Sequence, residues 1–209
     1  MLALVANTGK IESVATSGAV YAPGTPQEPC SAGIAILDGL RELEELVGVD
    51  AVQRARAQLT PEQRAELESA TALSWIRIST SAKLFDLVAS VAGREPESMV
   101  DEITRRAVKR TFTTAWRMLV RLTTDDALMK RAPAMYSRGR NTGVLTAGMR
   151  EPGLAELELT GWPGVPVRQV RVFGVGMQTI ALLAGRREVA LRFDCTRAGA
   201  HFQLRWSKS

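Results

Sequence analysis

The last third of the chain has the clearest pattern of hydrophobic and polar positions. Over residues 154–159, apolar residues alternate with Glu156 and Glu158. A period of two places apolar side chains on one face of a β-strand and carboxylates on the other. The preceding Pro152-Gly153 pair is typical of a turn, so residues 144–149 are predicted to fold back as the partner strand.

After the loop 161–166 the period changes. Apolar residues then recur three and four positions apart, which predicts an amphipathic helix; they are Val167, Val170, Phe173, Met177, Ile180 and Ala184. Gly174 and Gly176 each weaken such a helix by about 1 kcal/mol relative to Ala. Their presence indicates that another backbone packs closely there, and Gly185 is the expected C-terminal cap.

The end of the chain repeats the strand pattern. Two alternating segments flank the turn 196–199, and their apolar positions are Val189, Leu191, Phe193 and Cys195, then Phe202, Leu204 and Trp206. A sheet with one polar face must cover its other face with helices. We therefore predict an α+β fold, in which N-terminal helices pack on a small antiparallel sheet made by two C-terminal hairpins flanking a helix. Trp206, Phe193 and Phe173 are expected in the core.

Helical spacing dominates the chain before residue 143. Short helices are expected over residues 34–47, from residue 50, over 61–70 and from about 80 to Gly93. The third begins with a capping box, because the side chains of Thr60 and Gln63 can bond each other's backbone amides. Between the third and fourth helices, Trp75 is expected to pack into the core rather than stack on a ligand.

The longest helix is predicted over residues 96–123. Its apolar stripe includes Phe112, Trp116, Leu119 and Leu122. Its other face is basic, and the segment 125–140, with a break expected at Pro133, adds further cations; the basic surface is Arg105, Arg106, Lys109, Arg110, Lys130, Arg131, Arg138 and Arg140. Such a run is either a solvated face or a binding face for anions.

Composition is that of a folded protein, with 45% hydrophobic and 23% charged residues among 209. The net charge of +5 suits nucleic acid or an anionic membrane surface, and also an ordinary solvated surface. No apolar run approaches the roughly 18 residues of a membrane span, and the start lacks the pattern of a signal peptide. Cys30 and Cys195 form no spaced pair. A cytoplasmic location is expected.

Residues 1–30 are rich in small residues and proline, which is typical of an arm or linker. This arm packs on the body, packs on another subunit or is a loosely held tail. Residues 31–209 are then expected to form a single regulatory domain of the ligand-binding type.

Catalytic chemistry finds no support in the sequence. The single histidine, His201, lies on a strand face shared with Gln203 and Arg205, and no nucleophile is paired with it. The glycines at 139 and 143 lack the Lys-Ser/Thr pair of a phosphate-binding loop. We expect no enzymatic activity and no metal site.

The residues Cys195 to Trp206, with the glycine-bearing helix before them, carry a resemblance to a known family. The chain resembles a paralogous family of unknown function expanded in myxobacteria. That family is similar to 4-vinyl reductase domains, haem nitric-oxide-binding domains and TRAPP transport-particle subunits. The resemblance extends over residues 31–206 and implies a ligand-binding regulatory fold.

Two departures from these relatives concern cofactors. Haem nitric-oxide-binding domains use a helix histidine and a Tyr-x-Ser-x-Arg signature, whereas here the run from Tyr136 to Arg140 has its Ser one place early. In 4-vinyl reductase domains cysteines cluster near the corresponding C-terminus. Here Cys195 is the only cysteine in that region, and His201 occupies the position where a second cysteine would be expected. We therefore expect no cofactor and no haem.

The leading hypothesis is a non-enzymatic regulatory or adaptor domain, a homodimer that binds a protein partner. A small apolar ligand is expected between helices and sheet, with the pocket residues Phe112, Trp116, Leu119, Phe173, Met177 and Ile180. The competing interpretation is that these side chains simply fill the core. The alternative function is electrostatic binding of nucleic acid or anionic lipid through the basic helix face.

Overall fold

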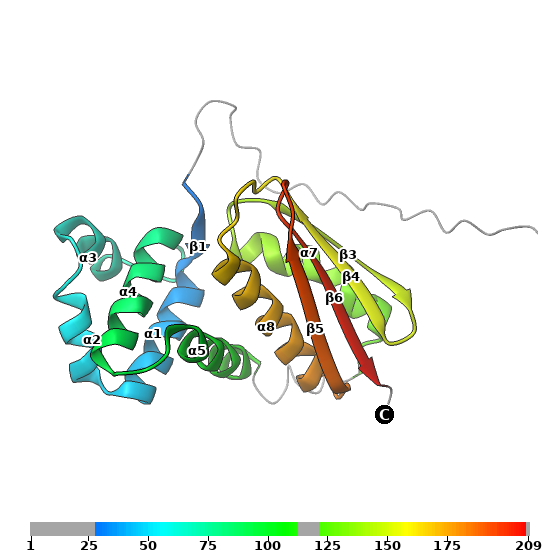
Figure 1. Cartoon of the computed structure of the whole chain (residues 1–209), viewed down its shortest axis with the longest axis horizontal. Coiled ribbons are helices and arrows are strands. Elements are labelled where there is room, and N and C mark those ends of the chain that lie inside the picture. Colours follow the sequence, from blue (N-terminus) through cyan, green and yellow to red (C-terminus); the bar gives the residue numbers. More distant parts are fainter. Residues whose placement is uncertain (1–27, 113–121, 208–209) are drawn as a thin grey trace, which may run out of the picture.

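The computed structural model of the chain describes residues 28–112 and 122–207 (Figure 1). Within these ranges the fold is α+β, as predicted, with two antiparallel sheets. The predicted arm up to residue 27, together with Trp116 and Leu119, lies outside the described residues. The elements are β1 (Cys30–Ala32), α1 (Gly33–Val47), α2 (Val49–Arg56), α3 (Pro61–Glu68), β2 (Trp75–Arg77), α4 (Ile78–Val91), α5 (Pro96–Thr111), α7 (Asp125–Gly139), β3 (Val144–Glu151), β4 (Leu154–Thr160), α8 (Val167–Leu183), β5 (Arg187–Cys195) and β6 (Ala200–Ser207).

Helices α1 to α5 form an N-terminal layer with its own hydrophobic core, which we call the helical layer. Leu43, Val52, Val88 and Met99 are completely buried in it. The capping box that starts α3 is present, because Thr60 Oγ1 accepts from the Gln63 amide at 3.2 Å and Gln63 Oε1 accepts from the Thr60 amide at 3.3 Å. No helix among the described residues is long and apolar enough to cross a membrane.

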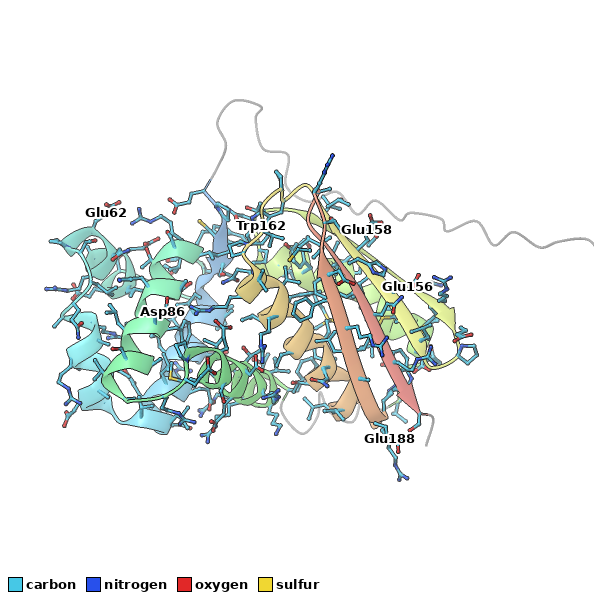
Figure 2. The ribbon with its side chains drawn as sticks, in the orientation of Figure 1. Glu62, Asp86, Glu156, Glu158, Trp162 and Glu188 are labelled. Atoms are coloured by element: carbon cyan, nitrogen blue, oxygen red, sulfur yellow. The ribbon has the colours of Figure 1, made fainter. Side chains whose placement is uncertain are left out.

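The four C-terminal strands form one antiparallel sheet in the order β3-β4-β6-β5. Both predicted hairpins are present, and β4 pairs with β6 so that Leu157 lies opposite Phe202. Helices α7 and α8 cover the apolar face, while Glu156 and Glu158 lie on the polar face (Figures 1 and 2). We call this unit the sheet layer. Figure 1 shows α8 between the sheet and the helical layer.

Of the three aromatic residues predicted in the core, one is buried in the sheet layer and two pack against its buried residues. Trp206 is 5% exposed and buried in this core. Phe173 and Phe193 are half-buried and pack against it. The rings of Phe173 and Phe202 meet edge to face with centroids 5.2 Å apart, an arrangement that aromatic pairs prefer.

The helix glycines behave differently from one another. A Cβ at Gly174 would lie 2.6 Å from Leu191 Cδ2, so this glycine admits a side chain of β5 rather than another backbone. At Gly176 the nearest atom would be Val108 Cγ2 at 3.9 Å, an ordinary contact. Gly174 therefore serves packing against the sheet, whereas a small side chain at Gly176 would only touch Val108 of α5.

Two helix predictions were wrong. The long helix ends at Thr111, where Phe112 leaves the helical region with φ −86° and ψ 81°, and Leu122 is 84% exposed. The Thr-Phe-Thr-Thr run starting at Thr111 has low helix propensity, which explains the end. By contrast, α7 continues through Pro133, because burial of its neighbours in the sheet-layer core offsets the lost hydrogen bond.

Two side-chain predictions were also wrong. Trp75 is 39% exposed, because the alternation of β2 gives the inward position to Ile76, which is 2% exposed. Cys195 is exposed, since it is the last residue of the edge strand β5 before the turn. A further tryptophan, Trp162 in the loop before α8, is buried instead.

Candidate ligand pocket between the two layers

A cavity of about 370 Å³ lies where α1, α4 and α5 of the helical layer face α7 and α8 of the sheet layer. Most of its wall is apolar, and both layers supply aromatic rings, Phe85 and Phe112 from one and Phe173 from the other. The volume falls in the range of small-molecule sites, which are typically concave, apolar and provided with few polar groups.

Four of the predicted pocket residues line this cavity, namely Phe112, Phe173, Met177 and Ile180. The other two, Trp116 and Leu119, lie outside the described residues. The structure adds Phe85 and Ile103 to the wall, which sequence reasoning missed. Their helical spacing placed them in a core, but no pattern showed that their core faced α8.

Small residues on both walls keep the cavity open. On α1, a Cβ at Gly39 would meet Phe85 Cζ at 3.4 Å, so the ring already occupies the nearest space there. On α8, a Cβ at Gly176 would meet Val108 Cγ2 of α5 at 3.9 Å. Ala82 and Ala107 extend the same small-residue lining. Larger residues at these positions would fill the cavity, as they do in an ordinary close-packed interior.

The main polar group of the wall is Arg140, just past the end of α7. Its Nη1 donates to the Gly139 carbonyl at 2.9 Å and its Nη2 to Gln169 Oε1 at 3.5 Å. No carboxylate forms an ion pair with it within the described part of the chain. Burial consequently lowers the pKa of its guanidinium. The sequence assigns Arg140 to a basic surface; in the structure its side chain is intermediate in exposure and also lines the cavity.

The backbone around Arg140 joins the two layers. The Arg140 amide donates to the Tyr136 carbonyl at 2.9 Å, and Arg140 forms a bridge with Ser31 of β1. Next to it, Asn141 Oδ1 accepts from the Cys30 amide at 2.6 Å. Residues 111 positions apart thus fix the backbone next to Arg140.

Tyr136 lies beside Arg140 in the cavity wall. Its hydroxyl donates to the Thr142 carbonyl at 2.7 Å, and its ring meets that of Phe173 edge to face. Burial raises the pKa of Tyr136 to about 12. The phenol is therefore protonated at neutral pH, and its proton is committed to the protein backbone.

A second arginine of the cavity wall, Arg168, is neutralised by its neighbours. It pairs with Asp86 of α4 at 2.6 Å and with Glu97 of α5 at 2.7 Å. Figure 2 shows Asp86 on the side of α4 that faces α8. One turn further, Arg171 forms two hydrogen bonds to the buried Asp101, at 2.8 and 2.7 Å. These pairs fasten α8 to the helical layer.

The other members of the predicted basic surface are distributed over α5 and α7. Several pair with carboxylates of this same chain: Arg105 with Asp101, Arg106 with Glu102, Arg110 with Glu42 and Glu45, and Lys130 with Asp126. Arg131 donates to Thr123 Oγ1 at 3.4 Å, and Arg138 is exposed. Lys109 also has an interaction partner. Much of this charge is thus balanced internally.

His201 is far from the cavity in the topology of the sheet. It lies on β6 opposite Glu158 and Asp194, on the polar face, while Phe202 beside it points to the helices. No group of three or more potential metal ligands occurs in the described ranges.

Comparison with known proteins finds similarity of fold but none of sequence family. No protein-family model matches the chain, and no curated protein matches it. Among solved structures, the Fe(II) unliganded H-NOX protein from K. algicida superposes with a TM-score of 0.63 at 12% identity, over 85% of this chain and 97% of that one.

Two further solved structures show the same fold. An oxygen-binding H-NOX domain related to soluble guanylate cyclases, in its oxygen complex, gives a TM-score of 0.59 at 14% identity, covering 85% and 95% of the two chains. A mutant of T. Tengcongensis H-NOX gives 0.58 at 14%, covering 85% and 98%. The chain therefore has the H-NOX fold, as the resemblance to haem nitric-oxide-binding domains predicted.

Haem, whose distortion has been studied in the H-NOX family, does not fit the residues of this cavity. Haem iron is held by a histidine, a thiolate, a Met/His pair or a tyrosine. The single histidine is on the opposite face of the sheet, and neither cysteine lines the cavity. Tyr136 lines it, but its raised pKa and its bond to Thr142 disfavour a tyrosinate ligand.

Proposed function

We propose that the protein is a non-enzymatic regulatory domain that senses a small apolar ligand held between its two layers. The observation that carries this proposal is the apolar cavity whose wall is shared by the helical layer and the sheet layer. A ligand that contacts both layers stabilises the arrangement in which they close around it. Binding is thereby converted into a change in the relative stability of two states of the domain.

The H-NOX-like fold supports this proposal. As part of the proposal, we retain the resemblance to the myxobacterial family and to 4-vinyl reductase and TRAPP domains. Residues 31–209 form the proposed sensor, with residues 1–30 as an arm. We place it in the cytoplasm, which agrees with the free thiols of Cys30 and Cys195.

Gly176→Leu tests the cavity directly. If the space is a ligand pocket, the leucine fills it, and binding of the neutral fluorescent probe N-phenyl-1-naphthylamine is lost. The free energy of unfolding then rises by up to about 1 kcal/mol, because leucine favours a helix more than glycine does. If the side chains instead fill the core, Gly176→Leu lowers the free energy of unfolding by about 1–3 kcal/mol through overpacking.

The matched control is Gly148→Leu on β3. Gly148 lies opposite Glu156 on the polar face of the sheet, and a Cβ there meets nothing within 4 Å. Probe fluorescence and urea unfolding are measured for both variants. Probe binding that survives in Gly176→Leu, or is lost in Gly148→Leu, contradicts the pocket.

The proposed sensor acts on a protein partner and self-associates as a homodimer. Large apolar side chains are exposed on both layers, among them Leu73, Val144, Val167 and Leu182. Sedimentation velocity at tens of micromolar is expected to show a dimer. A monomer at this concentration contradicts that part of the proposal.

Electrostatic binding of nucleic acid or anionic lipid is the weaker alternative. It needs cations that are available to phosphates. In the described structure Arg105, Arg106 and Arg110 of α5 are engaged by carboxylates of the chain itself. The cavity supports a small ligand more strongly than this face supports a polyanion.

A further inference from the structure

We propose that two copies of this chain pair through the edge strand β5, so that their sheets join into one continuous antiparallel sheet. This inference rests on the homodimer of the proposed function and names the surface that forms it. β5 is the last strand in the order β3-β4-β6-β5, so one side of its backbone has no strand partner within the described part of the chain (Figure 1). An unpaired edge of this kind is a template for a further strand.

The hydrogen bonds of the hairpin between β5 and β6 show which backbone groups point to the free edge. Thr196 and Gly199 exchange amide-to-carbonyl bonds of 2.9 and 3.4 Å at the turn. In an antiparallel pair, bonded residues alternate with residues whose N–H and C=O groups point away from the partner. Following the register from this turn, every second residue of β5 directs its backbone groups to the free edge, namely Leu191, Phe193 and Cys195.

The regular part of this edge is short, because the pairing of β5 with β6 is irregular at its start. The register shifts between Arg187 and Ala190, and Glu188 has a φ of 50° there. The Val189 carbonyl accepts a hydrogen bond from Gln178 Nε2 of α8 at 2.8 Å. A second strand therefore finds a regular edge only beyond this bulge.

Two side chains of opposite charge lie on the regular part of the edge. Arg192 and Asp194 are exposed and flank Phe193. Their neighbours across β6 are Gln203 and His201, and neither residue forms an ion pair among residues 28–112 and 122–207. Charged residues ordinarily protect an edge strand against pairing. On β5 the two charges differ in sign, so a partner with the same sequence can match them.

The other edge strand, β3, lacks this feature. Its Arg150 pairs with Glu156 at 2.7 Å, and its Glu151 pairs with Arg205 at 3.8 Å. Helix α7 also packs along β3. Of the two edges, β5 is therefore the one whose charges are available to a second copy.

The charges select one register for a two-fold pairing. In an antiparallel pair centred on Phe193, Arg192 of each copy lies opposite Asp194 of the other, so the two-fold axis produces two ion pairs. The outward backbone groups also meet in this register, because Leu191 faces Cys195 and the two Phe193 residues face each other. Pairings centred on Arg192 or Asp194 would instead put like charges directly opposite each other.

The apolar face of β5 fits the same pairing. Leu191 and Phe193 pack against the sheet-layer core but are only half-buried at this edge. In the proposed register the two Phe193 side chains lie next to each other at the two-fold axis, with Leu191 and Cys195 beside them. Pairing thus removes apolar area from water in addition to joining the charges.

Charge reversal followed by sedimentation velocity of the full chain tests the inference. Arg192→Asp and Asp194→Arg each place like charges opposite each other twice, and each is expected to weaken dimerisation at least about tenfold. The double variant Arg192→Asp/Asp194→Arg restores opposite charges and is expected to recover the dimer. Lys83→Asp, a reversal at an exposed residue of α4, is the control and leaves dimerisation unchanged.

Disulfide cross-linking tests the register independently of the charges. Opposed residues in a pair without hydrogen bonds have Cα atoms about 4.5 Å apart, which a disulfide can span. In a Cys195→Ser background, oxidising a mixture of the Arg192→Cys and Asp194→Cys proteins is expected to give more covalent dimer than oxidising either protein alone. Equal yields from Arg192→Cys alone contradict the register.

The outcomes separate this inference from the proposed function. A parent dimer that survives both single reversals overturns the β5 interface and leaves the homodimer standing at another surface. Single variants that dissociate without rescue in the double variant overturn the pairing of Arg192 with Asp194. A monomeric parent overturns the interface together with the homodimer. Because both residues lie on the polar face, every variant is expected to bind the neutral probe as the parent does.

Discussion

Trp206→Ala is expected to lower the free energy of unfolding by about 3–5 kcal/mol, the usual cost of removing a buried tryptophan. Trp206 is the last inward residue of β6 and is 5% exposed. Its backbone amide donates to the Gly153 carbonyl, which ties β6 to the turn between β3 and β4. The alanine leaves a cavity in the sheet-layer core that this fixed backbone cannot close.

Trp206→Phe is the matched control. The indole Nε1 is buried without a hydrogen-bond partner in the described structure, so losing its N–H forfeits no bond. Phenylalanine retains most of the apolar area, and the expected cost is about 1 kcal/mol. Urea unfolding followed by circular dichroism measures both variants. An unchanged midpoint for Trp206→Ala would show that this residue lies on the surface.

The sheet layer could be predicted from the sequence because its signals are local. The alternation around Glu156 and Glu158, the Pro152-Gly153 turn and the helical spacing after residue 166 each act within a few residues. They produced both hairpins, and α8 begins at the predicted Val167. The order β3-β4-β6-β5 was not predicted, because strand pairing between hairpins depends on contacts distant in sequence.

The pocket could be predicted only in part, for the same physical reason. Phe173 and Met177 were identified because the glycines of α8 made that helix unusual. Phe85 and Ile103 belong to the opposite wall, and their place there depends on how two layers with separate cores meet. A local pattern indicates which side chains are buried but not which buried face adjoins another.

Arg140 shows most clearly what local sequence patterns cannot predict. In the sequence it is one of four cations between residues 130 and 140, and adjacency placed it on a surface. Its position in the cavity wall depends on β1, which bridges to it, and on Gln169 of α8. Neither neighbour is close in the chain.

Arg110→Ala is expected to lower the free energy of unfolding by more than the loss of an ordinary exposed ion pair does, because it leaves the buried carboxylate of Glu42 without its partner. Arg110 was predicted as part of a basic surface, but its guanidinium bonds to Glu42 and Glu45 and so joins α5 to α1. The Glu42 side chain is 4% exposed. The Arg110 side chain is itself 41% exposed, so water screens part of this interaction.

Arg106→Ala on the same helix is the control. Arg106 pairs with Glu102 four residues earlier, and the two side chains are 42% and 34% exposed. Such a pair contributes about 0.3–0.5 kcal/mol. Urea unfolding and titration with a short DNA duplex at low salt are measured for both variants. If α5 instead serves as a binding face, the two substitutions weaken DNA binding equally and leave stability unchanged. If Arg110 instead joins α5 to α1, Arg110→Ala lowers the stability clearly and Arg106→Ala does not.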